Sequence, residues 1–244
     1  MNLFIDAFNL ILYKPLFNIL ILLYKYLPGD DFGIAVIALT ILIRFILYPL
    51  TAQSLRSQKV LSDLQPKLQE IQKKFKNDKE EQLKEMTELY QKEKINPFGS
   101  LLPLLIQLPL LIAIYQVFWR GFQPEEMVNI YNFISKPGEI NPNFLGLINL
   151  SKGSMGMAVL AGITQFFQSK TLIPSQKNNK AEEQGEMTKF SDMFQKQMLY
   201  FFPIFTILIL IRLPAAISLY WTITTIFSIV QQHFIFKKNH AQSN

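Results

Sequence analysis

The stretch FGIAVIALTILIRFILYPLTA, from Phe32 to Ala52, decides how this chain folds. As a helix rising about 1.5 Å per residue, its roughly 20 residues suffice to cross the ~30 Å hydrocarbon core of a bilayer. Arg44 is the only charged residue within it. The pattern therefore predicts a transmembrane helix that carries a single cation inside the membrane.

Charge-poor segments of similar length recur along the rest of the chain. They run from Phe98 to Trp119, Met155 to Ile173, Met198 to Leu213 and Ala215 to Phe236. The second of these is the weakest signal, since Gln165, Gln168 and Lys170 shorten its apolar part and a buried helix of a soluble core has a similar composition. Half of the 244 residues are hydrophobic, and the ionisable groups are concentrated between these segments. The predicted fold class is all-α, a polytopic membrane protein with five transmembrane helices rather than a water-soluble enzyme.

Residues 3–27 precede the first span and are apolar, but polar residues interrupt them. Pro15 is expected to break the helix, and the uninterrupted piece from Ile19 to Tyr24 is too short to cross a bilayer. We therefore expect residues 1–28 to contain an amphipathic helix that lies in the membrane interface. The alternative is an uncleaved signal anchor, and hence a sixth membrane segment, although the stretch has no basic n-region and no A-x-A-like site.

The Lys and Arg residues predict the orientation. Seventeen of the 24 fall on one side of the predicted membrane, six fall on the other, and Arg44 lies within it. The positive-inside rule then puts the N-terminus outside and the C-terminus in the cytoplasm. The predicted division of the chain is 1–28 interfacial helix region, 29–53 first span, 54–97 cytoplasmic hairpin, 98–121 second span, 122–153 extracytoplasmic loop, 154–173 third span, 174–196 cytoplasmic loop, 197–213 fourth span, 214–236 fifth span and 237–244 short cytoplasmic tail.

The segment 54–97 has an apolar pattern of its own. Residues spaced three and four apart form a heptad seam on each side of Asn77-Asp78: Leu61, Leu64, Leu68, Ile71 and Phe75 before it, and Leu83, Met86 and Tyr90 after it. We predict two antiparallel helices that bury these seams against each other, because a mere connector has no need of matched seams. Gln65-Pro66 is expected to bend the first helix near its start. Eight acidic groups offset the ten basic ones, which favours a solvated, coiled-coil-like hairpin over a nucleic-acid-binding arm.

The sequence contains no catalytic or metal-binding pattern. It has no cysteine, its two histidines, His233 and His240, lie at the C-terminal end, and no G-x-S-x-G, P-loop or H-E-x-x-H motif occurs. No Asp or Glu lies in the five charge-poor segments, whereas ion-coupled transporters normally place acids within their spans. We therefore predict neither an enzyme nor a cofactor or metal site.

Arg44 is the outstanding candidate residue. It lies about eight residues, or ~12 Å, inside the cytoplasmic end of its predicted span, where an Arg costs about 2.5–3.5 kcal/mol or more. No span supplies an acid to pair with it, and snorkelling to the headgroups covers that distance only in part. The favoured interpretation is a hydrated recess with an uncompensated positive charge. Its candidate walls are Thr40, Gln107, Gln165 and Trp221, although each alone is more often an ordinary interhelical hydrogen-bonding residue.

Four stretches of the sequence resemble the YidC/Oxa/Alb family of membrane protein insertases in its short bacterial form. They are TILIRFILYPLT, LQPKLQEIQKKF, LYQKEKINPFGSLLPLLIQLPLLIAIYQVF and LPAAISLYWTITTIFSIVQQHFI, which occur in the family's order within residues 32–236. The resemblance implies a five-helix core with a cytoplasmic hairpin and an interfacial helix, in the bacterial plasma (inner) membrane. It also implies that Arg44 is the groove arginine, that Thr40 and Trp221 meet substrate, that Gln165 lines the same groove, and that the hairpin helps to receive substrate.

The chain departs from the family at three points. It has no lipobox-type cysteine or large extracytoplasmic domain. Its tail is only about eight residues long, which weakens the case for ribosome binding through the tail. It reads Leu213-Pro214-Ala215-Ala216 where the family commonly has Pro-Ser-Gly. None of these departures affects the groove residues.

The expected function is that of an insertase and chaperone. It would receive nascent membrane proteins in a positively charged groove open to the cytoplasm and to lipid, and would promote their insertion without nucleotide hydrolysis. Nascent membrane proteins and lipids are the expected partners, with the Sec translocon, the ribosome and signal-recognition targeting components as further candidates. A small-solute channel or transporter and a structural assembly scaffold are the alternatives.

Overall fold

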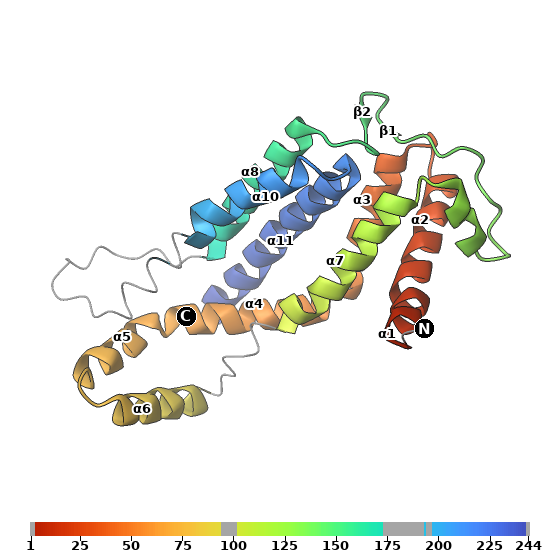
Figure 1. Cartoon of the computed structure of the whole chain (residues 1–244). Coiled ribbons are helices and arrows are strands. Elements are labelled where there is room, and N and C mark those ends of the chain that lie inside the picture. The colour runs from red at the N-terminus through yellow and green to blue at the C-terminus, as the bar shows by residue number, and fades with distance from the viewer. Residues whose placement is uncertain (1–2, 94–101, 173–192, 194–196, 243–244) are drawn as a thin grey trace.

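The structure is a computed structural model of the whole chain, and it describes residues 3–93, 102–172, 193 and 197–242. Helices make up most of the described chain (Figure 1). In chain order the elements are α1 (Leu3–Phe8), the π-helix η1 (Asn9–Tyr13), α2 (Lys14–Tyr26), α3 (Phe32–Ile46), α4 (Tyr48–Asp63), α5 (Gln65–Lys74), α6 (Lys79–Lys92), α7 (Leu102–Arg120), the 3-10 helix η3 (Pro124–Asn129), β1 (Asn143–Phe144), β2 (Ile148–Asn149), α8 (Met155–Leu172), the π-helix η4 (Gln197–Phe201), α10 (Phe202–Leu210) and α11 (Ala215–Gln242).

Helix α11 is the central element of the helical bundle. It packs most extensively on α8 and α3 and more sparsely on α7, while α10 packs on α8. Figure 1 shows α4, α5 and α6 at one end of this bundle and the β1–β2 hairpin at the other. The two ends of the molecule are therefore built from different kinds of structure, a helical hairpin and an irregular loop.

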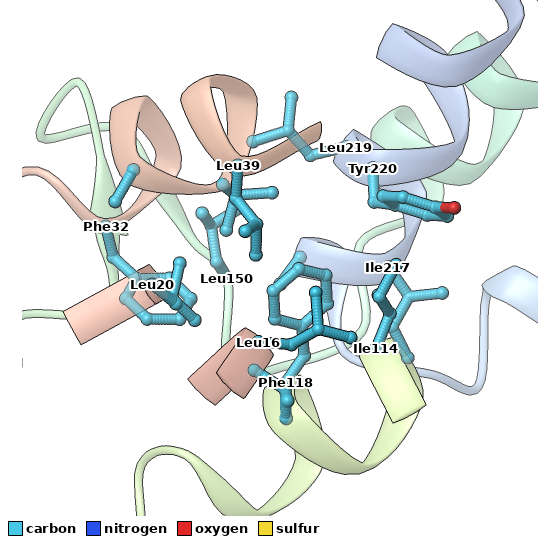
Figure 2. Close-up of a cluster of buried hydrophobic side chains, with 14 of the residues drawn as sticks. Leu16, Leu20, Phe32, Leu39, Ile114, Phe118, Leu150, Ile217, Leu219 and Tyr220 are labelled. Atoms are coloured by element: carbon cyan, nitrogen blue, oxygen red, sulfur yellow. The ribbon is translucent and has the colours of Figure 1, made fainter. Parts of the chain in front are cut away.

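The hydrophobic core joins α2, α3, α7 and α11 (Figure 2). Phe32 of α3, Phe118 of α7 and Tyr220 of α11 are almost completely buried in it. Phe118 meets both of the others edge-on, with ring centroids 6.3 Å from Phe32 and 6.5 Å from Tyr220. Leu150, from the loop before α8, closes the same cluster. Edge-to-face aromatic contacts of this kind stabilise a core beyond the burial of area alone.

The N-terminal helix is longer than the sequence suggested. We expected Pro15 to break it, but Leu3–Tyr26 forms one helix of 24 residues, so that expectation is wrong. The wider turn of η1 precedes Pro15, and Pro15 itself occupies the first turn of α2, where its missing N–H is tolerated. The assumption that this segment is too short to cross a bilayer therefore no longer holds.

The first predicted span is bent rather than straight. Helix α3 ends at Ile46, and α4 departs from it at an angle of 65°. Pro49 lies in the first turn of α4, where it cannot donate the hydrogen bond that a continuous helix requires. Within the described residues, the helix Leu3–Tyr26 and this bent pair, counted as one span, meet the length and composition of membrane-crossing helices. The number of five spans stays a prediction.

The loop between α7 and α8 contains a small β-hairpin that the all-α prediction did not include. Strands β1 and β2 pair antiparallel around a turn in which Leu145 and Gly146 have positive φ. Phe144 lies so close to Gly33 of α3 that a Cβ on this glycine would be 2.1 Å from the phenylalanine ring. Asp31 caps α3 through Gly33 N at 2.8 Å and also accepts from Leu145 N at 2.5 Å. The hairpin therefore docks on the start of α3.

Helices α5 and α6 lie antiparallel. Lys67 forms an ion pair with Glu93 at 3.0 Å, and Gln82 Nε2 donates to the carbonyl oxygen of Gln72 at 3.3 Å. Leu64 and Leu68 are buried, whereas Leu61, Ile71, Phe75, Met86 and Tyr90 are half-buried. Burial also raises the pKa of Tyr90 above its ordinary value.

The prediction that Leu83 belongs to the buried seam of this hairpin is wrong. Leu83 is 64% exposed, and Gln82 faces α5 in its place. Adjacent helical residues point about 100° apart, so a seam that runs through 82, 86 and 90 turns position 83 outwards.

One further boundary differs from the expected one, and another cannot be compared with the described residues. Helix α11 continues to Gln242, so the described part of the predicted tail is helical. The predicted 174–196 loop lies almost entirely outside the described residues.

Candidate functional site

Arg44 lies in the last turn of α3, three residues before the bend at Leu47. We expected it well inside a straight span, but α3 has 15 residues, or about 22 Å of helix, and ends two residues later. Its side chain is only 8% exposed. The arginine therefore lies at the junction between the bundle and α4, within the protein rather than on its surface.

No carboxylate partner of Arg44 occurs in the described part of the chain. The ion pairs found there are Lys59–Asp63, Lys67–Glu93 and Lys84–Glu81, all within α4, α5, α6 and their ends. The phenol of Tyr220 on α11 is close enough to interact electrostatically with Arg44. A buried cation without a carboxylate is unfavourable unless water or another polar group solvates it.

Thr40 of α3 and Gln107 of α7 are two further predicted site residues. Thr40 is fully buried one turn before Arg44, and its hydroxyl donates to the carbonyl oxygen of Val36 at 2.6 Å. Gln107 Nε2 on α7 donates to the hydroxyl oxygen of Tyr220 at 2.9 Å. Tyr220 therefore connects α7 to α11 beside the arginine.

Gln165 and Trp221 form a direct pair between α8 and α11. Trp221 Nε1 donates to Gln165 Oε1 at 2.8 Å. One turn further along, Thr225 Oγ1 donates to Thr164 Oγ1 at 2.7 Å. Side chain to side chain hydrogen bonds of this kind fix the register of two helices inside a membrane.

Trp221 also lines an apolar cavity of about 310 Å³. The cavity lies between α7, α10 and α11, and its other lining residues are Leu111, Ile112, Tyr115, Thr206, Ile209, Leu210, Leu213 and Ile217. Of the five predicted site residues, Trp221 alone borders it. The cavity is suited to hydrocarbon and not to charged groups.

The predicted residues do not form one cluster, since Gln107 and Gln165 are hydrogen-bonded to different residues of α11. Tyr220 is hydrogen-bonded to Gln107 on one side of α11, and Trp221 to Gln165 on the other, because consecutive helical residues point about 100° apart. Sequence reasoning did not single out Tyr220. The available signal was that a tyrosine hydroxyl in an apolar helix needs a hydrogen-bonding partner.

The fold and these residues define a class, the helical membrane proteins. The outer face of α10 exposes large apolar side chains, with Ile204 at 59% and Leu208 at 61%, while polar groups and Arg44 lie inside. Such an inverted distribution suits lipid rather than water as the surrounding solvent. The chain belongs to the family of the 60Kd inner membrane protein, whose model matches residues 22–242.

Relatives in this family are named membrane protein insertase YidC. That of Fusobacterium nucleatum is 34% identical over 208 residues, which cover 85% of this chain and 87% of the relative. That of Clostridium tetani is 36% identical over 194 residues, or 80% and 76% of the two chains. That of Wolinella succinogenes is 33% identical over 229 residues, which cover 94% of this chain but only 38% of the relative. The family resemblance seen in the sequence is confirmed.

A solved structure supports the fold. It is described as "Active YidC insertase crystal structure with the first transmembrane domain resolved", and it matches 94% of this chain and 46% of its own with a TM-score of 0.59. The sequence identity is 24%, so this match concerns the fold alone. In the described residues no group of three or more His, Cys, Asp or Glu could hold a metal ion.

Proposed function

We propose that this chain inserts nascent membrane proteins into the bilayer. Its membership of a family whose relatives are named insertases supports this function. The observation that carries the proposal is Arg44, a buried cation for which the described residues supply no carboxylate. A site of this kind attracts acidic groups that have to enter the membrane.

The proposed mechanism divides the substrate into two parts. Its polar N-terminal segment moves into a groove that is open to the cytoplasm and to lipid, where Arg44 attracts its acidic groups, while its apolar segment passes sideways into lipid. No nucleotide hydrolysis is needed, since hydrophobic transfer drives the second step and the membrane potential contributes ~2.3 kcal/mol per charge per 100 mV. Thr40, Gln107, Gln165 and Trp221 are proposed to line the path, and the α5–α6 hairpin to receive the substrate from the ribosome, targeting components or Sec translocon.

We further propose that the N-terminus lies outside, the C-terminus and the hairpin lie in the cytoplasm, and the membrane is the bacterial plasma membrane. The contacts of the N-terminal helix support its placement at the outer interface. Tyr13 OH donates to Glu126 Oε2 at 2.6 Å, and Tyr24 OH accepts from Asn141 N at 2.9 Å. Residues from the middle to the end of this helix therefore contact the proposed extracytoplasmic loop, which a helix crossing the bilayer could do only at one end.

The test is photocrosslinking in living cells. A photoreactive residue at position 40 or 221 is expected to crosslink to a nascent single-span protein, whereas one at Ile204 on the lipid-facing side of α10 serves as the matched control. Crosslinks at 40 and 221 no stronger than at 204 would refute the groove. A scaffold role is excluded if Arg44→Ala abolishes insertion while the protein accumulates normally in the membrane.

A further inference from the structure

A stripe of side chains on α11 follows the bend between α3 and α4. Phe227, Gln231 and Ile235 are spaced four residues apart and so lie on one face of the helix. Phe227 meets Phe45 of α3 edge-on, with ring centroids 5.5 Å apart. Ile235 packs in a small apolar cluster with Leu55 of α4. The stripe therefore contacts both limbs of the bend, and Gln231 lies between the two contacts.

Gln231 is hydrogen-bonded to the bend itself. Its side chain is 3% exposed, and its Nε2 lies 2.9 Å from Thr51 Oγ1 and 3.3 Å from the carbonyl oxygen of Tyr48. The Thr51 hydroxyl lies 3.0 Å from the carbonyl oxygen of Leu47, the residue that separates α3 from α4. A chain of partly buried hydrogen bonds thus runs from α11 to the point of the bend.

The bend needs such an external support. Pro49 removes a backbone hydrogen bond that would otherwise help to define the angle. Helix α4 has 16 residues, or about 24 Å, so a change of roughly 10° at the bend moves its far end by about 4 Å. The α5–α6 hairpin begins at that far end and moves with it.

We propose that Gln231 is a positioning residue for insertion. It holds α4 at the angle from which the α5–α6 hairpin delivers substrate to Arg44, which lies three residues before the bend. This inference rests on the proposed function, because it concerns the path of the inserted chain. Gln231 acts through Thr51 and Tyr48 and does not itself touch the substrate.

The neighbouring residue provides a matched control. Gln232 is 1% exposed and is hydrogen-bonded to Thr171 of α8 instead of to α4. Replacing either glutamine by leucine removes a buried amide of the same size from the same turn of α11. Only Gln231→Leu removes the support of the bend.

The distance between the hairpin and α8 tests the proposal. Because the chain contains no cysteine, spin labels can be attached to cysteines introduced only at Lys73 and Lys170, both exposed in the full-length protein. In liposomes, Gln231→Leu is expected to shift or broaden the measured distance distribution by about 4 Å or more, because a change of roughly 10° at the bend moves the far end of α4 by that distance. Thr51→Val should do the same, the double variant should add little because the two share one contact, and Thr51→Ser should restore the parent distribution.

Insertion of a single-span reporter is measured in parallel. Gln231→Leu and Thr51→Val are expected to reduce insertion about fivefold, as loss of one buried hydrogen bond allows, and Gln232→Leu to have a smaller effect. The proposal would be overturned if Gln231→Leu and Thr51→Val left the distances unchanged, or if Gln232→Leu shifted them equally. If Gln231→Leu does not fold, Thr51→Val decides the question. Failure of the parent chain to insert the reporter refutes the proposed function instead, while the distances still decide the role of Gln231.

Discussion

Asn18 ties the N-terminal helix to the segment after η3, and its replacement by leucine tests this connection. The side chain is 2% exposed. Its Nδ2 donates to the carbonyl oxygens of Lys14 at 2.8 Å and Asn129 at 2.9 Å, and its Oδ1 accepts from Tyr131 N at 2.7 Å. Leucine has the same branched shape and the same number of side-chain heavy atoms, so Asn18→Leu keeps the shape of the side chain but leaves the Asn129 carbonyl and the Tyr131 N–H without this partner.

The expected magnitude follows from these two groups. A buried polar group without a partner costs about 1–3 kcal/mol, so the total free-energy cost of leaving both groups without a partner is roughly 2–6 kcal/mol. Asn129 and Tyr131 are half-buried, and water replaces part of the lost bonding, which favours the lower end, about 2–3 kcal/mol. Local opening at Tyr131 should then become roughly 30- to 150-fold more frequent.

Hydrogen exchange of the peptide containing the Tyr131 amide is the assay, in detergent or in nanodiscs. Asn132→Leu is the control, because Asn132 lies next to Tyr131 but is exposed. Faster exchange is expected in Asn18→Leu and not in Asn132→Leu. Exchange at Tyr131 within about twofold of the parent would refute the view that Asn18 holds this segment.

Three further predictions concern the charge, the hairpin dock and the seam. Arg44→Ala should reduce insertion of reporters with acidic N-terminal segments far more than of neutral ones, whereas Arg44→Lys should retain most activity because attraction depends on charge; an equal loss for both kinds of reporter would contradict this. Gly33→Ala should destabilise the protein by about 1–3 kcal/mol in thermal unfolding because its Cβ would clash with Phe144, and a second change, Phe144→Ala, should relieve the clash. Leu68→Ala should destabilise the α5–α6 hairpin by about 2 kcal/mol, seen as faster limited proteolysis, while Leu83→Ala should stay within about 0.5 kcal/mol; equal effects of the two leucines would argue against the seam described above.

Periodicity predicted the kind of structure in each region but not its exact phase. The seam of Leu64 and Leu68 follows from their spacing, and both are buried. Leu83 fitted the same spacing rule yet is exposed, because the phase of α6 depends on how it lies against α5 and not on its own residues. Pro15 shows a related limit: a π-turn just before it lets the helix continue, and nothing in the local composition signals that turn.

Arg44 shows how far the candidate site could be predicted. A lone cation in an apolar stretch without any acid in the other spans is visible in the sequence, and its burial agrees with that reading. Its position relative to the bend was not visible, since the sequence pattern continues smoothly from Phe32 to Ala52 while the backbone turns by 65° after Ile46.

By itself the sequence determined that this is a helical membrane protein with one isolated arginine in its first apolar segment and a charged helical hairpin, because apolar length, charge distribution and heptad spacing are local properties of the chain. Only the tertiary structure decided which side chains meet. Gln107 and Tyr220 are 113 positions apart, and Thr51 and Gln231 are 180 apart. Such pairs exist because α11 packs against α7 and α4, and a hydrogen bond requires an approach of about 3 Å that no one-dimensional pattern encodes.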